Sequence, residues 1–448
     1  MAFSCLLISA AFLFGSTTAS PQTSLVPLRV STAGFHPVYD VEVTLGTKNF
    51  SLVIDTGSSD LWVVKTGYKC FDGATNAELA DEDCTFSSTT FDPSSSSTFQ
   101  PITNETFGAT YGLGIALGSL GYENVTVGGI TVPHQIIGVA DRVTIPGSES
   151  DSGIFGLSFP LLTSAHQGTV QPPNDTLLLG KVPYDPIFTR MYKEGLAEPW
   201  FSLALERLKP GEETAEGGYF GIGVLPEVEL SSDFIKVPAE PTDVIPLELT
   251  GGERQVVMWT LAVEAVTWGP SKSSSSKPTT NTTAFQATVD SGNWFNQLPQ
   301  EVADDIYAAY DPPATLDSKT GLYTVNCDVK PPTLGVTIAG HTFYHTAEDL
   351  VLVKGEGVCV STILPTALGE NGVGLNFLGD VFMHNVVSVF DFGKTEMRFA
   401  ARKDGGGVDE GNGGNGDSNQ PTGQTKSMAI SNSVLNVFLA AGLLVLAV

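Results

Sequence analysis

The stretch that decides the fold is Phe50-Ser-Leu-Val-Ile-Asp55-Thr56-Gly57-Ser58-Ser59-Asp60-Leu61-Trp62-Val63-Val64. It reads as a buried strand, a tight polar turn that carries Asp55, and a second apolar strand. Far downstream, the order of apolar strand, Asp, small hydroxyl residue and Gly returns in Phe285-Gln-Ala-Thr-Val-Asp290-Ser291-Gly292-Asn293. A third such triplet, Asp151-Ser152-Gly153, shows that the triplet alone is a weak signal, so the flanking strands carry the argument.

Two loops of this kind can bring two carboxylates together. Hydrolysis of a peptide bond without a metal or a nucleophilic side chain needs one group to take a proton from water and another to protonate the carbonyl oxygen. Two carboxylates a few ångströms apart cannot both ionise, so they share one proton and can do both. We therefore predict Asp55 and Asp290 as the catalytic pair. Their neighbours in the two loops are predicted to support them, since Gly permits close backbone approach and a hydroxyl can join the loops: Thr56, Gly57, Ser58, Ser291, Gly292 and Asn293.

Composition and charge narrow the class of protein. The chain has 448 residues, of which 42% are hydrophobic, enough for one large or two medium domains, and this excludes a disordered chain. Its 48 Gly and 27 Pro favour short strands joined by turns over a helical bundle. The net charge of −27 repels phosphate backbones, so we expect no nucleic-acid partner.

The motifs, taken in order, resemble those of pepsin-like aspartic proteases over about residues 30–402. The segment 108–129 is similar to the family's flap, a hairpin that closes over the substrate. In it Tyr111 matches the flap tyrosine, followed by Gly112 and Leu113, and Trp62 matches the tryptophan whose indole holds that tyrosine's hydroxyl. Segments 153–157 and 377–382 resemble the apolar-apolar-Gly segments that complete the two halves of the site, which makes Asp151 a bystander.

The resemblance implies an all-β, bilobal fold with two pseudo-symmetric lobes and the active-site cleft between them. It also implies an endopeptidase that acts on polypeptides at acidic pH, prefers large apolar residues beside the cut and needs no cofactor or metal. We expect a monomer. The alternatives are a catalytically inactive pepsin-fold protein that binds peptide or glycan at the cell surface and, less well supported, an adhesin on a Gly-rich stalk.

Three departures from the family pattern bear on these alternatives. Asn293 stands where the family usually has Thr or Ser, whose hydroxyl bonds the second carboxylate. The sequence therefore leaves open how the pKa of Asp290 is set. Leu113 occupies a flap position where a small polar residue is common. The stretch before Asp55 is about what the mature family domain needs, so a basic inhibitory pro-segment does not fit.

Both ends of the chain carry targeting patterns. Residues 1–19 predict a secretory signal peptide, with a buried N-terminal strand as the alternative. The lobes are predicted at 20–198 and 199–403. A Gly/Asn/Ser-rich stalk is expected at 404–426, followed by a removed tail at 427–448 that is apolar from Val434. This pattern predicts a glycosylphosphatidylinositol anchor, attached between Asn415 and Asn419 or at Gly423, and a tail-anchored helix is the alternative.

We therefore expect transport through the secretory pathway to the cell surface, with anchoring to the plasma membrane or cell wall, a design common in fungi. Once Cys5 leaves with the signal, four cysteines remain and permit three pairings, of which sequence proximity favours Cys70 with Cys84 and Cys327 with Cys359. The cysteine spacing does not suggest a zinc site. Five sequons predict glycosylation on a secreted surface: Asn49, Asn104, Asn124, Asn174 and Asn281.

Overall fold

The computed structural model describes residues 20–410 except 74, 169–179, 210, 243–246, 270–276, 356 and 369–373. The predicted signal peptide, Asn174, the anchor window and the apolar tail lie outside these residues. None of the helices in the described part has the length and apolar character needed to cross a membrane.

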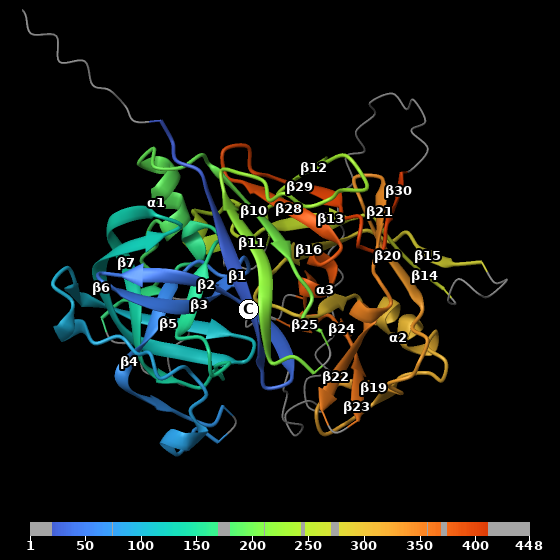
Figure 1. Cartoon of the computed structure of the whole chain (residues 1–448), viewed down its shortest axis with the longest axis horizontal. Helices are drawn as coiled ribbons and strands as arrows, with labels where there is room; N and C mark the ends of the chain where they lie inside the picture. Colours follow the sequence, from blue (N-terminus) through green and yellow to red (C-terminus); the bar gives the residue numbers. More distant parts are fainter. Residues whose placement is uncertain are drawn as a thin grey trace, which may run out of the picture.

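The largest element is a 14-stranded sheet that runs through the middle of the molecule (Figure 1). Its strands, in spatial order, are β12 (Ile235–Pro238), β29 (Glu396–Ala401), β28 (Val386–Asp391), β10 (Trp200–Leu205), β11 (Thr214–Ile222), β1 (Ser24–Ala33), β2 (His36–Leu45), β3 (Lys48–Asp55), β8 (Gly153–Gly156), β4 (Leu61–Cys70), β7 (Ile130–Val143), β6 (Gly114–Val127), β5 (Gln100–Tyr111) and β9 (Ala165–Gln167). Because β10 and β11 pair into the sheet beside β1, the sheet crosses the predicted lobe boundary at 198.

Smaller sheets build the C-terminal side. One holds β13 (Thr260–Val263), β16 (Phe285–Val289), β27 (Phe377–Leu378), β17 (Asn296–Leu298) and β24 (Ile363–Pro365). A second holds β15 (Thr279–Asn281), β14 (Ala265–Gly269), β20 (Thr333–Ile338), β21 (His341–Tyr344) and β30 (Val408–Glu410). The others are β18 (Thr315–Leu316), β19 (Tyr323–Val325), β23 (Val358–Ser361) and β22 (Val351–Gly355), and the pair β25 (Ala367–Leu368) and β26 (Gly374–Leu375).

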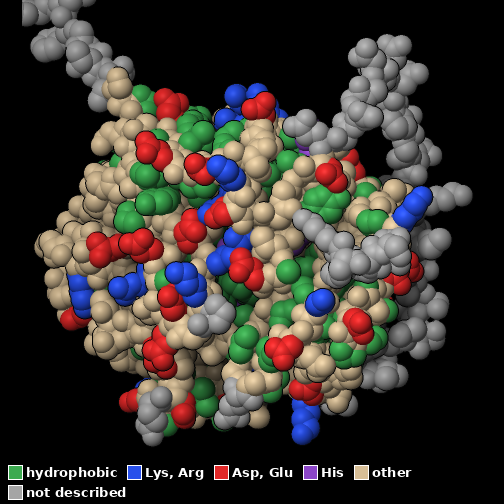
Figure 2. Space-filling model, turned by 45° about the vertical axis from the view of Figure 1, so that its right-hand side comes forward, with side chains coloured by type: hydrophobic (Ala, Val, Ile, Leu, Met, Phe, Trp, Pro, Cys, Tyr) green, Lys and Arg blue, Asp and Glu red, His purple; other side chains and the backbone are tan. Residues whose placement is uncertain are grey.

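Three short α-helices are described: α1 (Ile187–Lys193), α2 (Gln300–Ala308) and α3 (Asp380–Met383). Figure 1 shows β1, β10 and β11 between β2–β7 on one side and β14–β24 on the other. Acidic side chains are spread over the face seen in Figure 2, consistent with the strongly negative net charge. The strand-rich, two-sided architecture confirms the predicted all-β fold.

Alternating burial explains why these segments are strands. In β3, Phe50, Leu52 and Ile54 are buried, whereas Ser51 and Val53 between them are more exposed. This two-residue period suits a strand with one face in the core. The buried apolar residues of β2, β3 and β16 belong to one core cluster that extends through both sides of the molecule. That shared core fixes the ends of β3 and β16 relative to each other.

The same strand arrangement occurs once on each side of the molecule. β3 pairs in parallel with β8, which pairs in turn with β4 in the antiparallel sense. On the other side, β16 pairs in parallel with β27, which pairs in the antiparallel sense with β17. In each case a loop follows the buried strand that makes the parallel pairing, β3 on one side and β16 on the other. The predicted pseudo-symmetry therefore has a direct structural basis.

Both predicted disulfides are present, Cys70–Cys84 and Cys327–Cys359. The predicted start of the stalk at 404 differs from the structure, because Val408 pairs with Phe343 in the β21–β30 ladder. Asp404 also accepts hydrogen bonds from Arg402, at 2.9 Å from both Nε and Nη2. Because this segment is rich in glycine, the sequence did not indicate the strand β30.

Candidate active site

Asp55 is held at the end of β3 by donors from its own loop. Its partner across the β3–β8 ladder is Gly156, and the side chain is 5% exposed. The amide of Gly57 donates to Oδ1 at 2.8 Å and the amide of Ser58 to the same oxygen at 3.2 Å. The Ser58 hydroxyl donates to Oδ2. Three donors therefore stabilise the ionised form of this carboxyl group.

Asp290 follows β16 at the equivalent point and receives fewer donors. Its amide donates to the carbonyl of Leu378 at 3.1 Å, so the residue continues the strand ladder. The side chain is 1% exposed, and the amide of Gly292 donates to its Oδ1 at 2.9 Å. Asp290 has no equivalent of the Ser58 hydroxyl bond, so its ionised form is less well stabilised than that of Asp55.

Reciprocal hydrogen bonds join the two loops. The Thr56 hydroxyl donates to the carbonyl of Val289 at 2.8 Å and accepts from the amide of Ser291 at 3.0 Å. The Ser291 hydroxyl donates to the carbonyl of Ile54 at 2.9 Å and accepts from the amide of Thr56 at 3.1 Å. Each hydroxyl thus satisfies buried backbone groups of the opposite half. The structure places both residues where the sequence predicted support.

Gly57 and Gly292 allow the two carboxyl groups to meet. A Cβ atom on Gly57 would lie 2.6 Å from the carboxyl atoms of Asp290, and one on Gly292 would lie 2.6 Å from Oδ1 of Asp55. Real Cβ atoms do not approach this closely, so each glycine is required by the carboxylate of the opposite loop. The two carboxyl groups are hydrogen-bonded to each other. The structure therefore brings together the two aspartates that the sequence singled out.

Burial and mutual repulsion set the protonation of this pair. Burial raises the pKa of Asp290 well above its usual range, and the neighbouring charge of Asp55 raises it further. Burial also raises the pKa of Asp55, but hydrogen bonds from Ser58 and Gly57 oppose the rise. We assign the shared proton to Asp290 and the negative charge to Asp55, because Asp55 has the greater number of donors.

Asn293 does not take over the role of Ser58 in the second loop. Its side-chain Oδ1 accepts from the amide of Phe295 at 3.1 Å. Its Nδ2 is buried and has no hydrogen-bond partner among the described residues. The side-chain amide therefore gives Asp290 no hydrogen bond that would lower its pKa.

The predicted flap is the hairpin of β5 and β6, with Gly112 and Leu113 at its tip. Trp62 lies on β4, and its indole Nε1 donates to the hydroxyl of Tyr111 at 2.7 Å. Both side chains are buried. Gly112 is exposed, whereas Leu113 is half-buried and packs against the main core cluster. The resemblance correctly placed the tryptophan beside the flap tyrosine.

Other predicted residues lie apart from the pair. Asp151 accepts from the amide of Ser148 at 2.6 Å and takes no part in the Asp55–Asp290 contact. Of the described sequons, Asn49 and Asn104 are exposed, whereas Asn124 and Asn281 are half-buried. Glycosylation at these positions stays a prediction.

Sequence reasoning missed two buried carboxyl groups beside the site. Asp60 accepts from the amide of Ser164 at 2.9 Å and from the Tyr184 hydroxyl at 2.5 Å. Asp380 begins α3, and its amide donates to the carbonyl of Asn293 at 2.8 Å. Burial raises the pKa of Asp380 well above its usual range, and the charges of Asp290 and Asp55 raise it further. The sequence signal that could have identified Asp380 is the Gly-Asp pair at the start of the buried helix α3.

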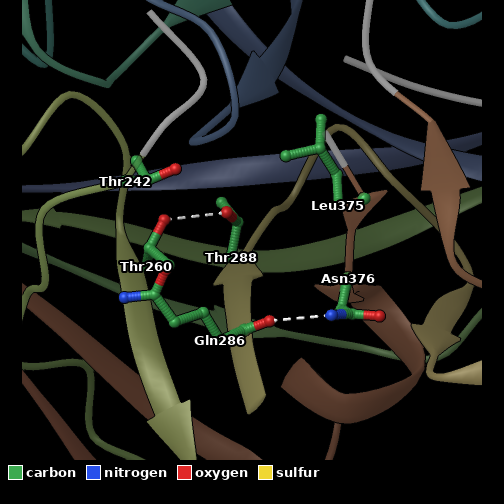
Figure 3. A pocket seen from close by; sticks show the side chains of 7 residues that line it. Thr242, Thr260, Gln286, Thr288, Leu375 and Asn376 are labelled. Atoms are coloured by element: carbon green, nitrogen blue, oxygen red, sulfur yellow. Dashed lines mark hydrogen bonds between the residues drawn. The ribbon is translucent and has the colours of Figure 1, made fainter. Parts of the chain in front are cut away.

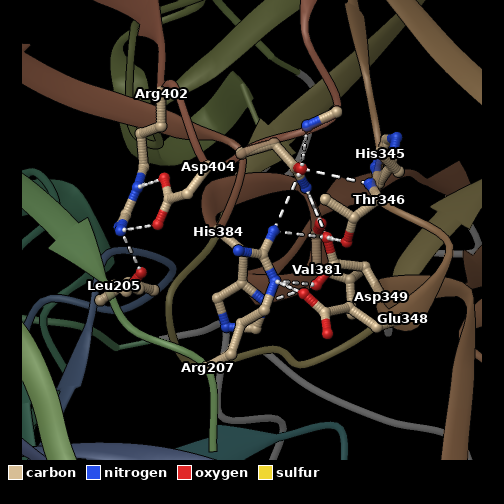
Figure 4. A network of polar contacts seen from close by, with 12 residues as sticks. Leu205, Arg207, His345, Thr346, Glu348, Asp349, Val381, His384, Arg402 and Asp404 are labelled. Atoms are coloured by element: carbon tan, nitrogen blue, oxygen red, sulfur yellow. Dashed lines mark hydrogen bonds and ion pairs between the residues drawn. The ribbon is translucent and has the colours of Figure 1, made fainter. Parts of the chain in front are cut away.

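A buried polar network on the C-terminal side contains His384, Asp349 and Arg207 (Figure 4), and Tyr39 ties it to β2. The Tyr39 hydroxyl lies 2.6 Å from Nε2 of His384, and Nδ1 of His384 lies 2.9 Å from Oδ1 of Asp349. Arg207 donates to both oxygens of Asp349 at 2.8 Å. Burial alone would raise the pKa of Asp349, but hydrogen bonds from His384 and Arg207 hold it below its usual range. The network joins the two sides that carry the aspartates.

Comparison with known proteins agrees with this geometry. Residues 38–402 match the family model for eukaryotic aspartyl proteases. A protein of Aspergillus fumigatus described as a probable aspartic-type endopeptidase is 35% identical over 81% of this chain and 78% of its own. Penicillopepsin-1 of Penicillium janthinellum is 26% identical over 81% of this chain and 94% of its own.

The structure of an aspartic proteinase from Irpex lacteus has the same fold, with a TM-score of 0.60 at 20% identity over 85% of this chain and 98% of its own. The predicted fold and the predicted enzyme class, an aspartic endopeptidase, are thereby confirmed. The chain belongs to the eukaryotic aspartyl protease family.

Proposed function

We propose that Asp55 and Asp290 are the catalytic residues of this endopeptidase and hydrolyse peptide bonds with an activated water molecule. The observation that carries the proposal is the direct contact of two buried carboxyl groups between Gly57 and Gly292. Carboxyl pairs of aspartic proteases are the standard example of groups that share one proton because both cannot ionise.

The different surroundings of the two carboxyl groups support a different role for each. Asp55, ionised and held by three donors, takes a proton from water as the water oxygen attacks the carbonyl carbon. Asp290 gives its proton to the carbonyl oxygen, which forms a neutral tetrahedral intermediate. As the carbon–nitrogen bond breaks, Asp55 passes its proton to the leaving nitrogen and Asp290 recovers one from the intermediate. The pair ends the cycle with one shared proton.

The flap supplies the second part of the proposal, which is substrate binding. Its hairpin carries Tyr111, Gly112 and Leu113, and the bond from Trp62 orients Tyr111. A peptide held beneath this hairpin would be shielded from water, which strengthens electrostatic interactions in the site. We propose polypeptide substrates, an acidic working range and a preference for large apolar residues at the cut.

Replacement of each aspartate tests the catalytic proposal. We expect Asp55→Asn and Asp290→Asn to lower kcat by about 10³-fold or more, because either change removes half of the acid–base pair. Asp151→Asn is the matched control, since it alters the third Asp-Ser-Gly triplet away from the site. Pepstatin-type inhibition should accompany the wild-type activity.

Retained activity in Asp290→Asn would refute the assignment. Folded wild-type protein that binds pepstatin but cleaves no peptide from pH 3 to 7 would favour the alternative function, an inactive peptide-binding protein.

We also propose that the enzyme is delivered to the cell surface, glycosylated, and tethered as a monomer by a glycosylphosphatidylinositol anchor. The support is the polar stretch before residue 427 followed by the apolar segment from Val434, together with the sequons and disulfides. Phosphatidylinositol-specific phospholipase should release the protein from membranes. Recovery of a membrane-bound form that retains the peptide ending in Val448 would contradict the anchor.

A further inference from the structure

The indole of Trp62 lies against three aromatic rings. The ring centroids of Phe107 and Tyr111 are 6.1 and 6.3 Å from that of Trp62, and both residues belong to β5, the first strand of the flap. The third ring, that of Phe86, meets the indole edge-on, with centroids 5.9 Å apart and an interplanar angle of 71°. Of these three rings, Phe86 alone comes from outside the flap hairpin. It is therefore the ring that can hold the indole independently of the flap.

Backbone hydrogen bonds fix the segment that carries Phe86. The carbonyl of Thr85 accepts from the amide of Glu149 at 2.5 Å, and the amide of Ser87 donates to the carbonyl of Asp151 at 2.7 Å. Both partners lie in the loop between β7 and β8. The backbone is thus held by this loop immediately before and immediately after Phe86.

The Cys70–Cys84 disulfide ties the same segment to the strand that carries Trp62. Cys84 is two residues before Phe86, and Cys70 is the last residue of β4. Phe86 is 8% exposed and belongs, with Trp62 and Cys70, to a buried cluster that is separate from the main core. A Cβ atom on Gly147 would lie 2.8 Å from Cγ of Phe86. The Phe86 ring therefore contacts both the β7–β8 loop and the indole, and its position is fixed by both.

The corresponding position in the second half of the molecule carries a polar side chain. Gln297 stands seven residues after Asp290, as Trp62 stands seven residues after the first aspartate. Its Nε2 and Oε1 are buried with no hydrogen-bond partner among the described residues. Beside the strand that leads into Asp290, a polar pair is formed by Thr260 and Thr288, whose hydroxyl oxygens are 3.0 Å apart (Figure 3). The aromatic packing around the indole is thus specific to the side that carries the flap.

We propose that Phe86 is a positioning residue for the flap, which holds the Trp62 indole in the orientation from which Nε1 donates to the Tyr111 hydroxyl. Two contacts carry this inference: the edge-on contact of Phe86 with the indole, and the 2.7 Å hydrogen bond from the indole to Tyr111. An indole released on one side would be free to rotate, and the fraction of enzyme with Tyr111 held in place would fall. The inference rests on the proposed function, because the position of the flap matters to catalysis only if the flap binds the substrate.

A double-mutant cycle in the full chain tests the path from Phe86 through Trp62. Phe86→Leu keeps an apolar side chain and removes the ring, and it should lower kcat/KM for one peptide about fivefold, the effect of losing one aromatic pair. In the Trp62→Phe background the same change should lower kcat/KM less than about twofold, because the bond to Tyr111 is already absent.

Two control variants separate positioning from general packing. Phe86→Tyr keeps the ring and should stay within about twofold of the wild type in kcat/KM. Phe91→Leu removes a buried ring of the same segment that packs on Phe50 and Phe99 instead of the indole. It should lower stability and leave kcat/KM of the folded enzyme at the wild-type value.

Solvent exchange of the Trp62 indole N–H is a second readout, which does not need activity. Its NMR signal is identified by its loss in Trp62→Phe. We expect this exchange to be about fivefold faster in Phe86→Leu than in the wild type, because the bond to Tyr111 would be made less of the time.

The outcomes separate this inference from the catalytic proposal. Unchanged exchange or unchanged kcat/KM in folded Phe86→Leu would overturn the positioning role, as would equal losses of kcat/KM in the two backgrounds of the cycle. If Phe86→Leu does not fold, Phe86→Met fills the site with a flexible apolar chain and takes its place in both measurements. Absence of cleavage of every peptide by the wild type would instead contradict the proposed function, and the exchange of the Trp62 indole N–H would then decide the positioning role alone.

Discussion

Asp40→Asn should make the free energy of unfolding much less dependent on pH between 4 and 7. Asp40 lies in β2 and is 1% exposed. Its Oδ2 accepts from Ser150 Oγ at 2.9 Å and Ser31 Oγ at 3.3 Å, while Oδ1 is buried with no hydrogen-bond partner among the described residues. Burial, aided by the charge of Asp151, raises the pKa of Asp40 to about 7.

The direction of the effect follows from linkage. Asp in the unfolded chain has a pKa of about 3.9, so the folded protein binds this proton more tightly than the unfolded chain does. The stabilisation is fully present below about pH 4 and is lost as the pH rises toward 7. At about 1.36 kcal/mol per pH unit, the gap in pKa corresponds to roughly 4 kcal/mol, of which about 3 kcal/mol is lost between pH 4 and 7. Asn cannot ionise and loses none of it.

Urea unfolding at pH 4 and pH 7 measures this difference. We expect the unfolding free energy of the wild type to fall by about 3 kcal/mol more than that of Asp40→Asn between the two pH values. Asp305→Asn, at an exposed position of α2, is the matched control and should follow the wild type. Equal pH dependence in the wild type and Asp40→Asn would refute the reasoning.

Three further substitutions test the site. Asn293→Thr should supply Asp290 with the missing donor and move the basic limb of the pH–rate profile down by about one unit, and an unchanged basic limb would show that the hydroxyl does not reach the carboxyl group. Trp62→Phe removes the donor to Tyr111 and should lower kcat/KM of the folded enzyme about tenfold, whereas wild-type kinetics would show that this bond does not position the flap. Thr56→Val breaks the two inter-loop hydrogen bonds of the Thr56 hydroxyl and should lower the unfolding free energy by about 2–4 kcal/mol in urea titrations, whereas a loss below about 0.5 kcal/mol would contradict their structural role.

The meeting of Asp55 and Asp290 was predictable because its determinants are local. An apolar strand followed by Asp, a hydroxyl residue and Gly predicts both the position of the carboxyl group and the tight turn of the loop that carries it. The contact between Trp62 and Tyr111 had no such local pattern and was reached only through resemblance to a family. The two residues are 49 positions apart, and their bond depends on how β4 packs against the flap.

Features that depend on long-range packing could not be predicted from the sequence. Tyr39 and His384 are 345 positions apart, and nothing near either residue indicates that they share a hydrogen bond. The orientation of Asn293 depends on the amide of Phe295, so the sequence could identify the departure but not its effect. The buried state of Asp40 depends on serines brought from other segments. Such residues look like ordinary surface aspartates until the sheets are assembled.

The pH dependence of kcat/KM for the wild type, followed with one well-cleaved peptide from pH 2 to 9, tests the shared proton most directly. We expect a bell on the acid side of neutrality, because activity needs Asp55 ionised and Asp290 protonated, and the raised pKa of Asp290 keeps its proton to higher pH than an ordinary carboxyl group would. The acid limb reports protonation of Asp55 and the basic limb the loss of the proton from Asp290. A single-sided profile, or an optimum above pH 8, would contradict the account.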